Sequence, residues 1–312
     1  MRSRSVMRNA FMSELVALAA INKNIVLMVG DLGYSVVEPF RDQFPDRFIN
    51  AGVAEQNMMG MAAGLASEGC HVFVYSIANF PTFRCAEQIR NDVDYHQLPV
   101  TVVSVGGGLA YGNLGYSHHA VQDYALMRVM PNMLIGAPGD PLEVSSCLRY
   151  LVNNPQPSYL RLGKAGEKSV NLGHQLLELA PGMWNKISLA RDTQASKAIL
   201  STGNGLQIVS DFLPQLETLG FDVYSMPLWG MKNKLLQPMQ VQPYESLYLV
   251  EDHLLDGGFS SWMLEALLSS PALLGRIKAK TLSTEVCGLV ASQHELHKLS
   301  GMDQLLNFFV NE

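Results

Sequence analysis

Three groups of side chains in this sequence have types and surroundings that chemistry could use: a lone carboxylate, a histidine pair and two phenylalanines. Glu55 is the only charged residue between positions 53 and 67, a segment that otherwise reads as a helix of apolar and small residues. Because Glu55 lies three residues past Gly52, its position alone is better explained by a helix N-terminus, where negative charge is favoured by about 0.3–1 kcal/mol. A chemical role for Glu55 therefore needs support from other residues.

The histidine pair, His118 and His119, lies in a glycine-rich stretch of the kind that forms an exposed, adaptable loop. Such a pair is consistent with proton handling or contact with an anion, and equally with no chemical role. Phe80 and Phe83 are better explained as core residues if only their spacing is considered. A chemical role for these side chains becomes the better explanation only if the fold brings them to a common location.

Short apolar runs alternate with helical patterns along the chain, and this order predicts parallel sheets covered by helices on both faces. The predicted strands are 24–31, 71–78, 99–107, 132–138, 157–164, 197–204, 221–227, 245–253 and 278–286. The predicted helices are 6–21, 53–67, 83–96, 120–130, 141–153, 205–219, 258–269 and a last one within 303–310. We expect an α/β protein with two doubly wound domains, residues 1–165 and 196–312, joined by a linker over 166–195.

Four stretches with polar or aromatic side chains fall at or beyond the ends of predicted strands. They are GDLGYS (30–35), NAGVAEQN (50–57), ANFPTFR (78–84) and the glycine-rich stretch GGGLAYGNLGYSHHAVQD (106–123). Open α/β sheets build their binding sites outside the carboxyl ends of their strands. These four stretches are therefore the candidate site.

The composition of the 312-residue chain argues against several classes of partner. A formal net charge of −6 without any run of basic residues is unfavourable for binding nucleic acid. No stretch of about 18 apolar residues occurs, so we expect no membrane span, and the short apolar run near the N-terminus fits an amphipathic helix better than a signal peptide. Four widely spaced cysteines predict reduced thiols in a cytoplasmic protein, not a zinc site.

Two short motifs suggest other enzymes but lack a required residue. STGNGLQI (201–208) has Ile208 where a dinucleotide-binding loop needs its third glycine. GYSHH (115–119) has His119 where the strained turn of a serine hydrolase needs a small residue. Both patterns are better explained as ordinary turns and loops.

The stretch RFINAGVAEQNMMGMAAGLASEG (47–69) resembles the pyrimidine-binding domain of thiamine-diphosphate enzymes of the transketolase and deoxyxylulose-phosphate synthase group. The resemblance continues through EQIRNDVDYHQLPV, GYSHHAVQDYALMRVMPNMLIGAPGDPLE and PSYLRLGK. The second unit, with AILSTGNGLQIV, VYSMP and YLVEDHLLDGGFSS, is similar to the C-terminal domain of the same group. The resemblance covers nearly the whole chain, and its motifs are specific in combination.

The resemblance implies that Glu55 activates thiamine diphosphate by hydrogen bonding to N1′ of its aminopyrimidine ring, which allows the thiazolium C2 proton to leave. An apolar setting that raises the pKa of this carboxylate would help it to share a proton. Phe80, with Phe83 as second choice, resembles the aromatic residue that stacks on the pyrimidine. Asp31 matches the acidic residue at the end of the first strand and is placed with the cofactor-binding residues.

The resemblance also implies a substrate site. His118 matches the histidine of the Gly-x-Thr-His loop, which lies near the substrate and acts in catalysis. Arg8 and Ser35 fall at positions that bind sugar phosphate in transketolases, and Arg161 and Lys164 match basic positions that can do the same. Two or three cations are what a phosphate dianion needs.

Three differences from the family pattern fall in or beside the histidine loop. Ser117 replaces the threonine, and Leu114 stands where the family has an acidic residue that orients a substrate hydroxyl. Transketolases also carry a histidine near the end of the preceding strand, where this chain has three consecutive glycines, 106–108. Substrate recognition is therefore expected to differ from that of an ordinary pentose-phosphate enzyme.

The chain lacks the Gly-Asp-Gly and downstream Asn that hold Mg²⁺ and the diphosphate in these enzymes. It resembles only the C-terminal half of a full-length transketolase. We therefore expect a partner subunit that supplies the Mg²⁺ and diphosphate site, in an assembly such as α₂β₂. The small residues after Glu55 would then pack against another subunit.

Three functions are compatible with this sequence. The first is a subunit of a transketolase that moves a two-carbon ketol unit between sugars or sugar phosphates. The second is the β subunit of a 2-oxo acid dehydrogenase, which the basic residues and the SHHAVQD loop make less favourable. The third is a non-catalytic partner subunit that retains the fold.

Overall fold

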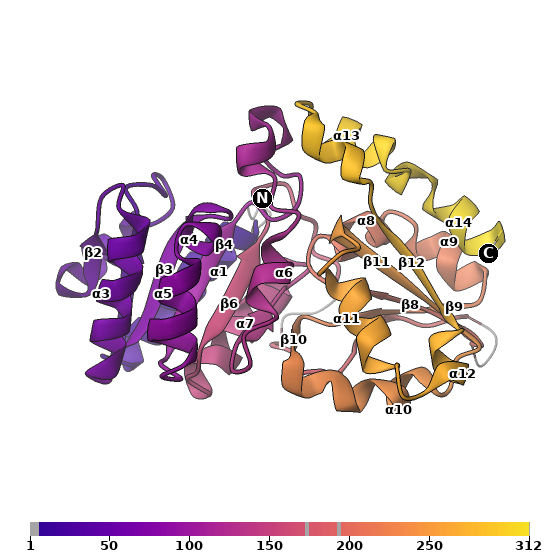
Figure 1. Ribbon diagram of the computed structural model, residues 1–312, viewed down its shortest axis with the longest axis horizontal. Helices are drawn as coiled ribbons and strands as arrows, with labels where there is room; N and C mark the ends of the chain where they lie inside the picture. The colour runs from indigo at the N-terminus through magenta and orange to yellow at the C-terminus, as the bar shows by residue number, and fades with distance from the viewer. Residues whose placement is uncertain (1–5, 172–174, 192–194, 312) are drawn as a thin grey trace.

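The structure is a computed structural model that describes residues 6–171, 175–191 and 195–311 (Figure 1). The chain folds into two α/β units that lie side by side, one coloured from indigo to magenta in Figure 1 and the other from orange to yellow. Both contain a mainly parallel sheet, which confirms the predicted fold class. Among the described residues, no helix combines the length and the apolar character needed to cross a lipid bilayer.

The first unit is built on a seven-stranded sheet with the order β10-β5-β6-β4-β3-β1-β2. Its strands are Ile25–Val29 (β1), Phe48–Asn50 (β2), His71–Ile77 (β3), Val100–Val105 (β4), Leu134–Gly136 (β5), Ser158–Leu162 (β6) and Leu228–Gly230 (β10). All neighbours are parallel except β10 and β5. Every residue of β1, β4 and β6 is buried, because central strands of a parallel sheet are covered on both faces.

Helices cover both faces of this sheet. They are Met7–Ile21 (α1), Glu38–Gln43 (α2), Glu55–Ser67 (α3), Phe80–Phe83 (α4), Ala86–Gln88 (α5), Asp123–Met127 (α6) and Pro141–Asn153 (α7). On one face α1 packs against α2 and α7, and on the other α3 packs against β3. The helix predicted over 83–96 is broken into α4, α5 and a π-helical stretch, Ile89–Asp94, a rare form that is frequent near functional sites.

The second unit has a five-stranded sheet with the order β12-β11-β8-β9-β7. Its strands are Asn185–Ser188 (β7), Lys197–Ser201 (β8), Phe221–Ser225 (β9), Ser246–Leu254 (β11) and Ile277–Leu282 (β12). Its helices are Gly205–Ser210 (α8), Leu213–Thr218 (α9), Gln237–Val241 (α10), Phe259–Ala266 (α11), Pro271–Leu274 (α12), Gln293–Leu299 (α13) and Leu305–Asn311 (α14). The predicted linker, 166–195, contains β7, which pairs antiparallel with β9, while residues 172–174 and 192–194 of that linker lie outside the described residues.

The two units share a strand and part of a core. β10 belongs in sequence to the second unit, yet it forms the edge of the first sheet by pairing with β5. Trp229 in β10 is fully buried, and its ring centroid lies 5.2 Å from that of Tyr124 in the first unit and 5.4 Å from that of Trp262 in the second. One continuous apolar cluster thus crosses the boundary between the units.

A buried ion pair fixes the same boundary. Arg161, at 3% exposure, donates from Nε to Oδ2 of fully buried Asp123 at 2.8 Å. Its Nη2 donates to the carbonyl oxygen of Ala120 at 2.7 Å and to that of Asp252, in β11, at 3.1 Å. The guanidinium also lies over the ring of Tyr124, 4.5 Å from its centroid. A single side chain therefore joins the end of the histidine loop to the second unit.

Removal of this guanidinium should destabilise the protein strongly. Arg161→Ala leaves the Asp123 carboxylate buried without a charged partner, so we expect the free energy of unfolding to fall by about 3–5 kcal/mol. Chemical denaturation followed by tryptophan fluorescence measures the change. Arg41→Ala, which removes an exposed guanidinium paired with Asp42, is the control and should leave the midpoint unchanged. Equal midpoints for the two variants would contradict the structural role of Arg161.

Candidate functional site

The four stretches singled out in the sequence lie at one edge of the first sheet. β4, β3, β1 and β2 are consecutive neighbours and run parallel, so their carboxyl ends are on the same side. The segment after each strand carries one of the stretches: 30–35 after β1, 50–57 after β2, 78–84 after β3 and 106–123 after β4. The topology therefore accounts for their common location.

Glu55 is the first residue of α3 and is buried, with 6% of its surface exposed. The N-cap position belongs to Ala54, and no side chain caps this helix. The Glu55 carboxylate instead accepts a hydrogen bond from Arg84, with 3.1 Å between Nη1 and Oε1. Glu55 therefore lies at a helix N-terminus, where its charge is favoured, but its carboxylate is directed to a side chain of another segment and does not cap the helix.

Arg84 is a site residue that the sequence reasoning missed. It follows Phe80 by four positions in a continuous helical turn, which puts both side chains on one face. Its guanidinium carbon lies 4.3 Å from the centroid of the Phe80 ring, while Nη1 contacts Glu55. The side chain is about half exposed. The i, i+4 spacing of an aromatic residue and an arginine within ANFPTFR was the available signal.

His118 lies against the other side of this group. Its ring centroid is 5.3 Å from that of Phe80, and the two rings are nearly perpendicular, with 71° between their planes. Nδ1 of His118 is 3.0 Å from Oγ of Ser117, the residue that replaces the family threonine. Partial burial, followed by the proximity of His119 and Arg84, lowers the pKa of His118 below its usual value of 6.5. The ring is consequently neutral at pH 7 and can accept a proton.

The loop that carries His118 is tied to the end of β3. Nδ2 of Asn79 donates to the carbonyl oxygen of His119 at 2.8 Å and to that of Ser117 at 3.2 Å. His119 is buried, and its Nε2 lies 3.2 Å from the carbonyl oxygen of Gly112 in the same loop. Of the two histidines, His119 therefore supports the loop and His118 faces the site.

Tyr111 connects His118 to two of the predicted cations. Its ring centroid is 6.1 Å from that of His118, and Nζ of Lys164 lies 4.3 Å from the same ring centroid. Burial raises the pKa of Tyr111 and of Tyr75, and the positive charge of Arg8 partly opposes both shifts. Lys164 thus lies over the aromatic neighbour of His118, and Arg8 is close enough for its charge to act on Tyr111. Tyr111 is a second residue that sequence reasoning did not identify.

The glycines at 106–108 explain why no histidine follows β4. Gly106 has a φ of +83°, and a Cβ there would lie 2.1 Å from the ring of Tyr111. Gly108 has a φ of +67°, and a Cβ there would lie 1.7 Å from Oδ2 of Asp252. Any side chain at these places would collide with its neighbours and adopt a strained backbone. Tyr111 and Asp252 occupy the volume instead.

Asp31, Ser35 and Phe83 lie outside the compact group around Glu55. Asp31 is exposed and accepts hydrogen bonds from Nδ2 of Asn50 at 3.0 Å and from the hydroxyl of Tyr34 at 3.3 Å. Ser35 is exposed with a φ of +64°. Phe83 is 47% exposed, so Phe80 is the phenylalanine that the structure brings to the site.

The position of Arg161 corrects an expectation from the sequence. We expected Arg161 to bind a sugar phosphate, but its guanidinium is buried and is bound to Asp123 and to two carbonyl oxygens. A phosphate could reach it only by displacing these internal partners, which would leave the Asp123 carboxylate unpaired. In this structure Arg161 is a structural residue, and of the cations expected to bind phosphate Lys164 and Arg8 remain as candidates.

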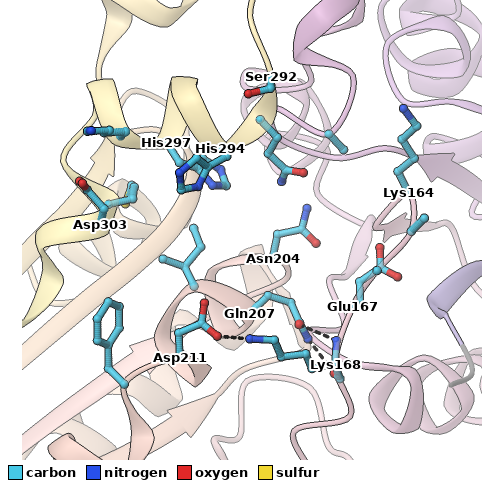
Figure 2. Close-up of a pocket in the computed structure, with 18 residues that line it drawn as sticks. Lys164, Glu167, Lys168, Asn204, Gln207, Asp211, Ser292, His294, His297 and Asp303 are labelled. Atoms are coloured by element: carbon cyan, nitrogen blue, oxygen red, sulfur yellow. Dashed lines mark hydrogen bonds and ion pairs between the residues drawn. The ribbon is translucent and has the colours of Figure 1, made fainter.

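A separate cavity of about 620 Å³ lies between the two units (Figure 2). Lys164 is the one predicted site residue that lines it, together with Asn204 and Gln207 from α8 and its start and with residues of α13. Figure 2 places His294 and His297 on α13 with their rings directed into this space. Glu55, Phe80 and His118 are not part of its lining.

The charge around His118 can be tested by titration. Arg84→Ala removes a cation that disfavours the protonated ring, so the pKa of His118 should rise. A pH titration of the His118 ring resonances by NMR measures the shift. Arg90→Ala, which removes an exposed arginine elsewhere on the surface, serves as the control and should have no effect. An unchanged His118 pKa in Arg84→Ala would show that the two side chains are not close enough to interact.

Comparison with known proteins places this chain in a family. Residues 4–166 match the model of the transketolase pyrimidine-binding domain. A putative transketolase C-terminal section from Methanocaldococcus jannaschii is 30% identical over 95% of this chain and 92% of its own length. One of the subunits of an apulose-4-phosphate transketolase from Phocaeicola vulgatus is 30% identical over 85% of this chain and 84% of its own length.

Two further similarities define which part of the family fold is present. A 1-deoxy-D-xylulose-5-phosphate synthase from Methylacidiphilum infernorum is 28% identical over 85% of this chain but over only 41% of its own length. A solved structure described as a split gene transketolase, inactive beta4 tetramer, superposes with a TM-score of 0.81 at 27% identity and covers 96% of this chain and 94% of its own. The chain therefore belongs to the transketolase family and corresponds to the C-terminal half of a transketolase.

Proposed function

We propose that this chain is the C-terminal subunit of a two-chain, thiamine-diphosphate-dependent transketolase. It moves a two-carbon ketol unit from a ketose phosphate to an aldose acceptor. The observation that carries this proposal is the group formed by the buried Glu55 carboxylate, the Phe80 ring and His118, which meet at the carboxyl edge of the first sheet. Family membership supports the cofactor, and the local geometry supports the roles of these residues.

The residues fit the pyrimidine ring of the cofactor. Arg84 puts a flat, hydrogen-bond-donating group against Phe80 and in contact with Glu55. A pyrimidine ring presents the same two features, a flat face for stacking and a nitrogen that can share a proton with a carboxylate. Because the Arg84 side chain is half exposed, it can move into solvent when another flat group takes this place.

Each residue then has a definite task. Bound at this place, thiamine diphosphate supplies a nucleophilic carbon and an electron sink for breaking a carbon–carbon bond. Glu55 holds a proton between its carboxylate and the pyrimidine nitrogen, and Phe80 orients the ring. His118, whose pKa is lowered, is neutral and can take a proton from a substrate hydroxyl.

The substrate is a sugar phosphate whose phosphate is held by Arg8 and Lys164 beside Tyr111. These two cations supply the positive charge that a phosphate dianion requires. Two relatives of similar length are named for apulose-4-phosphate, which supports a phosphorylated sugar other than an ordinary pentose. Leu114 is about half exposed and stands where the family has an acidic residue that orients a substrate hydroxyl. Leucine cannot make that hydrogen bond, which supports a substrate that differs at this hydroxyl.

The enzyme is active only when a second chain supplies the Mg²⁺ and diphosphate site, and an α₂β₂ assembly is the simplest arrangement. Relatives named as a C-terminal section and as a single subunit of a transketolase support the division into two chains. The solved split-gene relative described as an inactive beta4 tetramer supports the absence of activity in the isolated chain.

Glu55→Gln in the reconstituted pair is the direct test of the catalytic role. Glutamine keeps the shape of the side chain but cannot share a proton, so kcat should fall by at least about 10²-fold. Activity is assayed with a ketose phosphate donor and an aldose acceptor, and in parallel with pyruvate plus lipoamide. Glu87→Gln, at an exposed position, is the matched control.

The possible outcomes separate the candidate functions. Ketol transfer that survives Glu55→Gln would support a non-catalytic subunit and refute the proposed role of Glu55. Activity with pyruvate plus lipoamide, and none with sugars, would identify a 2-oxo acid dehydrogenase component instead.

The dependence on a partner predicts a second result. The isolated chain should show no ketol transfer and should bind thiamine diphosphate weakly, because the diphosphate site is on the other chain. Titration calorimetry with and without Mg²⁺ measures this binding. Tight, Mg²⁺-dependent binding to the isolated chain would contradict a site divided between two chains.

A further inference from the structure

The C-terminal unit packs directly against the loop that carries His118. Leu296 of α13 belongs to one buried apolar cluster with Leu109 and Val121, which lie at the two ends of that loop. Gly112 in the middle of the loop has no room for a side chain, since a Cβ would be 2.7 Å from the carbonyl oxygen of Ala291 and from Cδ1 of Leu296. Figure 1 shows α13 beside the top of this loop.

A polar network fixes the start of the same loop. The carboxylate of Asp252, at the end of β11, accepts a hydrogen bond from Nε2 of His297 at 2.9 Å and from Nδ2 of Asn204 at 3.3 Å. Nδ2 of Asn204 also donates to the carbonyl oxygen of Gly107 at 3.1 Å. The Asp252 carboxylate occupies the space next to Gly108 where a side chain would otherwise be.

The polar network and the apolar contact depend on each other. His297 and Leu296 are adjacent in α13, so the hydrogen bond with Asp252 holds the helix in the position that places Leu296 against Gly112. Burial lowers the pKa of His297, but the charge of Asp252 and its hydrogen bond outweigh this effect and raise the pKa above its usual value. Both contacts are made by the C-terminal unit, and both act on a segment of the first unit.

Loop 108–119 needs such support because its glycine-rich sequence allows many backbone conformations. It contains three glycines, of which Gly108 and Gly115 have positive φ angles. Asn79 of the first unit holds the loop through hydrogen bonds from Nδ2 to the carbonyl oxygens of Ser117 and His119. A glycine-rich segment loses much conformational entropy when it is held in one place.

We propose that α13 and Asp252 position the His118 loop, with His297 and Leu296 as positioning residues for the reaction. This gives the C-terminal domain a role in catalysis without contact with the substrate. The catalytic part of this proposal rests on the proposed function, because it requires that His118 acts on the substrate. The packing itself is independent of that function.

The test compares His297→Ala, His297→Gln and His294→Ala. His297→Ala removes the hydrogen bond to Asp252, and His297→Gln retains a donor at about the position of Nε2. His294→Ala changes an exposed residue on the same helix and is the control. Hydrogen exchange of loop 108–119 is measured on the full-length chain, and kcat and KM are measured in the reconstituted pair.

We expect His297→Ala to speed exchange in the loop by about tenfold. It should lower kcat by about tenfold while changing KM by less than about twofold, because the catalytic group is misplaced and the binding residues are not. His297→Gln should restore both quantities, and His294→Ala should change neither. Leu296→Ala, if it folds, should reproduce the effects of His297→Ala.

Two results would overturn the proposal. Unchanged loop exchange in His297→Ala would show that α13 does not hold the loop. Faster exchange with unchanged kcat would show that the loop position does not matter for turnover. If the wild-type pair lacks ketol transfer, the proposed function fails, but the exchange experiment still decides whether α13 holds the loop.

Discussion

The buried contact between Arg161 and Asp123 is the interaction on which the arrangement of the site depends. The Arg161 guanidinium pairs with the buried Asp123 carboxylate, and it also donates hydrogen bonds to the carbonyl oxygens of Ala120 and Asp252. Ala120 closes the histidine loop, and Asp252 belongs to the C-terminal unit. The position of the loop is therefore set by both units together, and a buried charge makes that arrangement costly to change.

The site follows from this constraint. Parallel strands bring Glu55, Phe80 and His118 to one edge of the first sheet, and the histidine loop also packs against the C-terminal unit. The group has the parts needed to hold a flat, proton-sharing ring, whereas the motif that binds a metal and a diphosphate is absent from the sequence. Family membership as a C-terminal half supports the proposal that another chain completes the site.

The sequence predicted those features that depend on local pattern. β1 is a continuous apolar run, and β4 is a valine-rich run interrupted by Thr101 and Ser104, so the existence and parallel arrangement of such strands were foreseeable. Three-residue β10 could not be predicted, because its place in the first sheet comes from the burial of Trp229 between the units. Arg161 was wrongly expected to bind phosphate, since a sequence does not tell whether a basic residue finds an internal carboxylate. Arg84 and Tyr111 were missed because their importance lies in contacts made through the fold.

The proton-sharing role of the site can be measured without any substrate. Exchange of the thiazolium C2 proton of thiamine diphosphate with deuterium, followed by NMR, reports directly whether the protein promotes loss of that proton. If Glu55 shares a proton with the cofactor, exchange should be faster than in free cofactor only when this chain and its partner subunit are both present with Mg²⁺. Exchange as slow as in free cofactor, or equally fast with the partner subunit alone, would contradict that role.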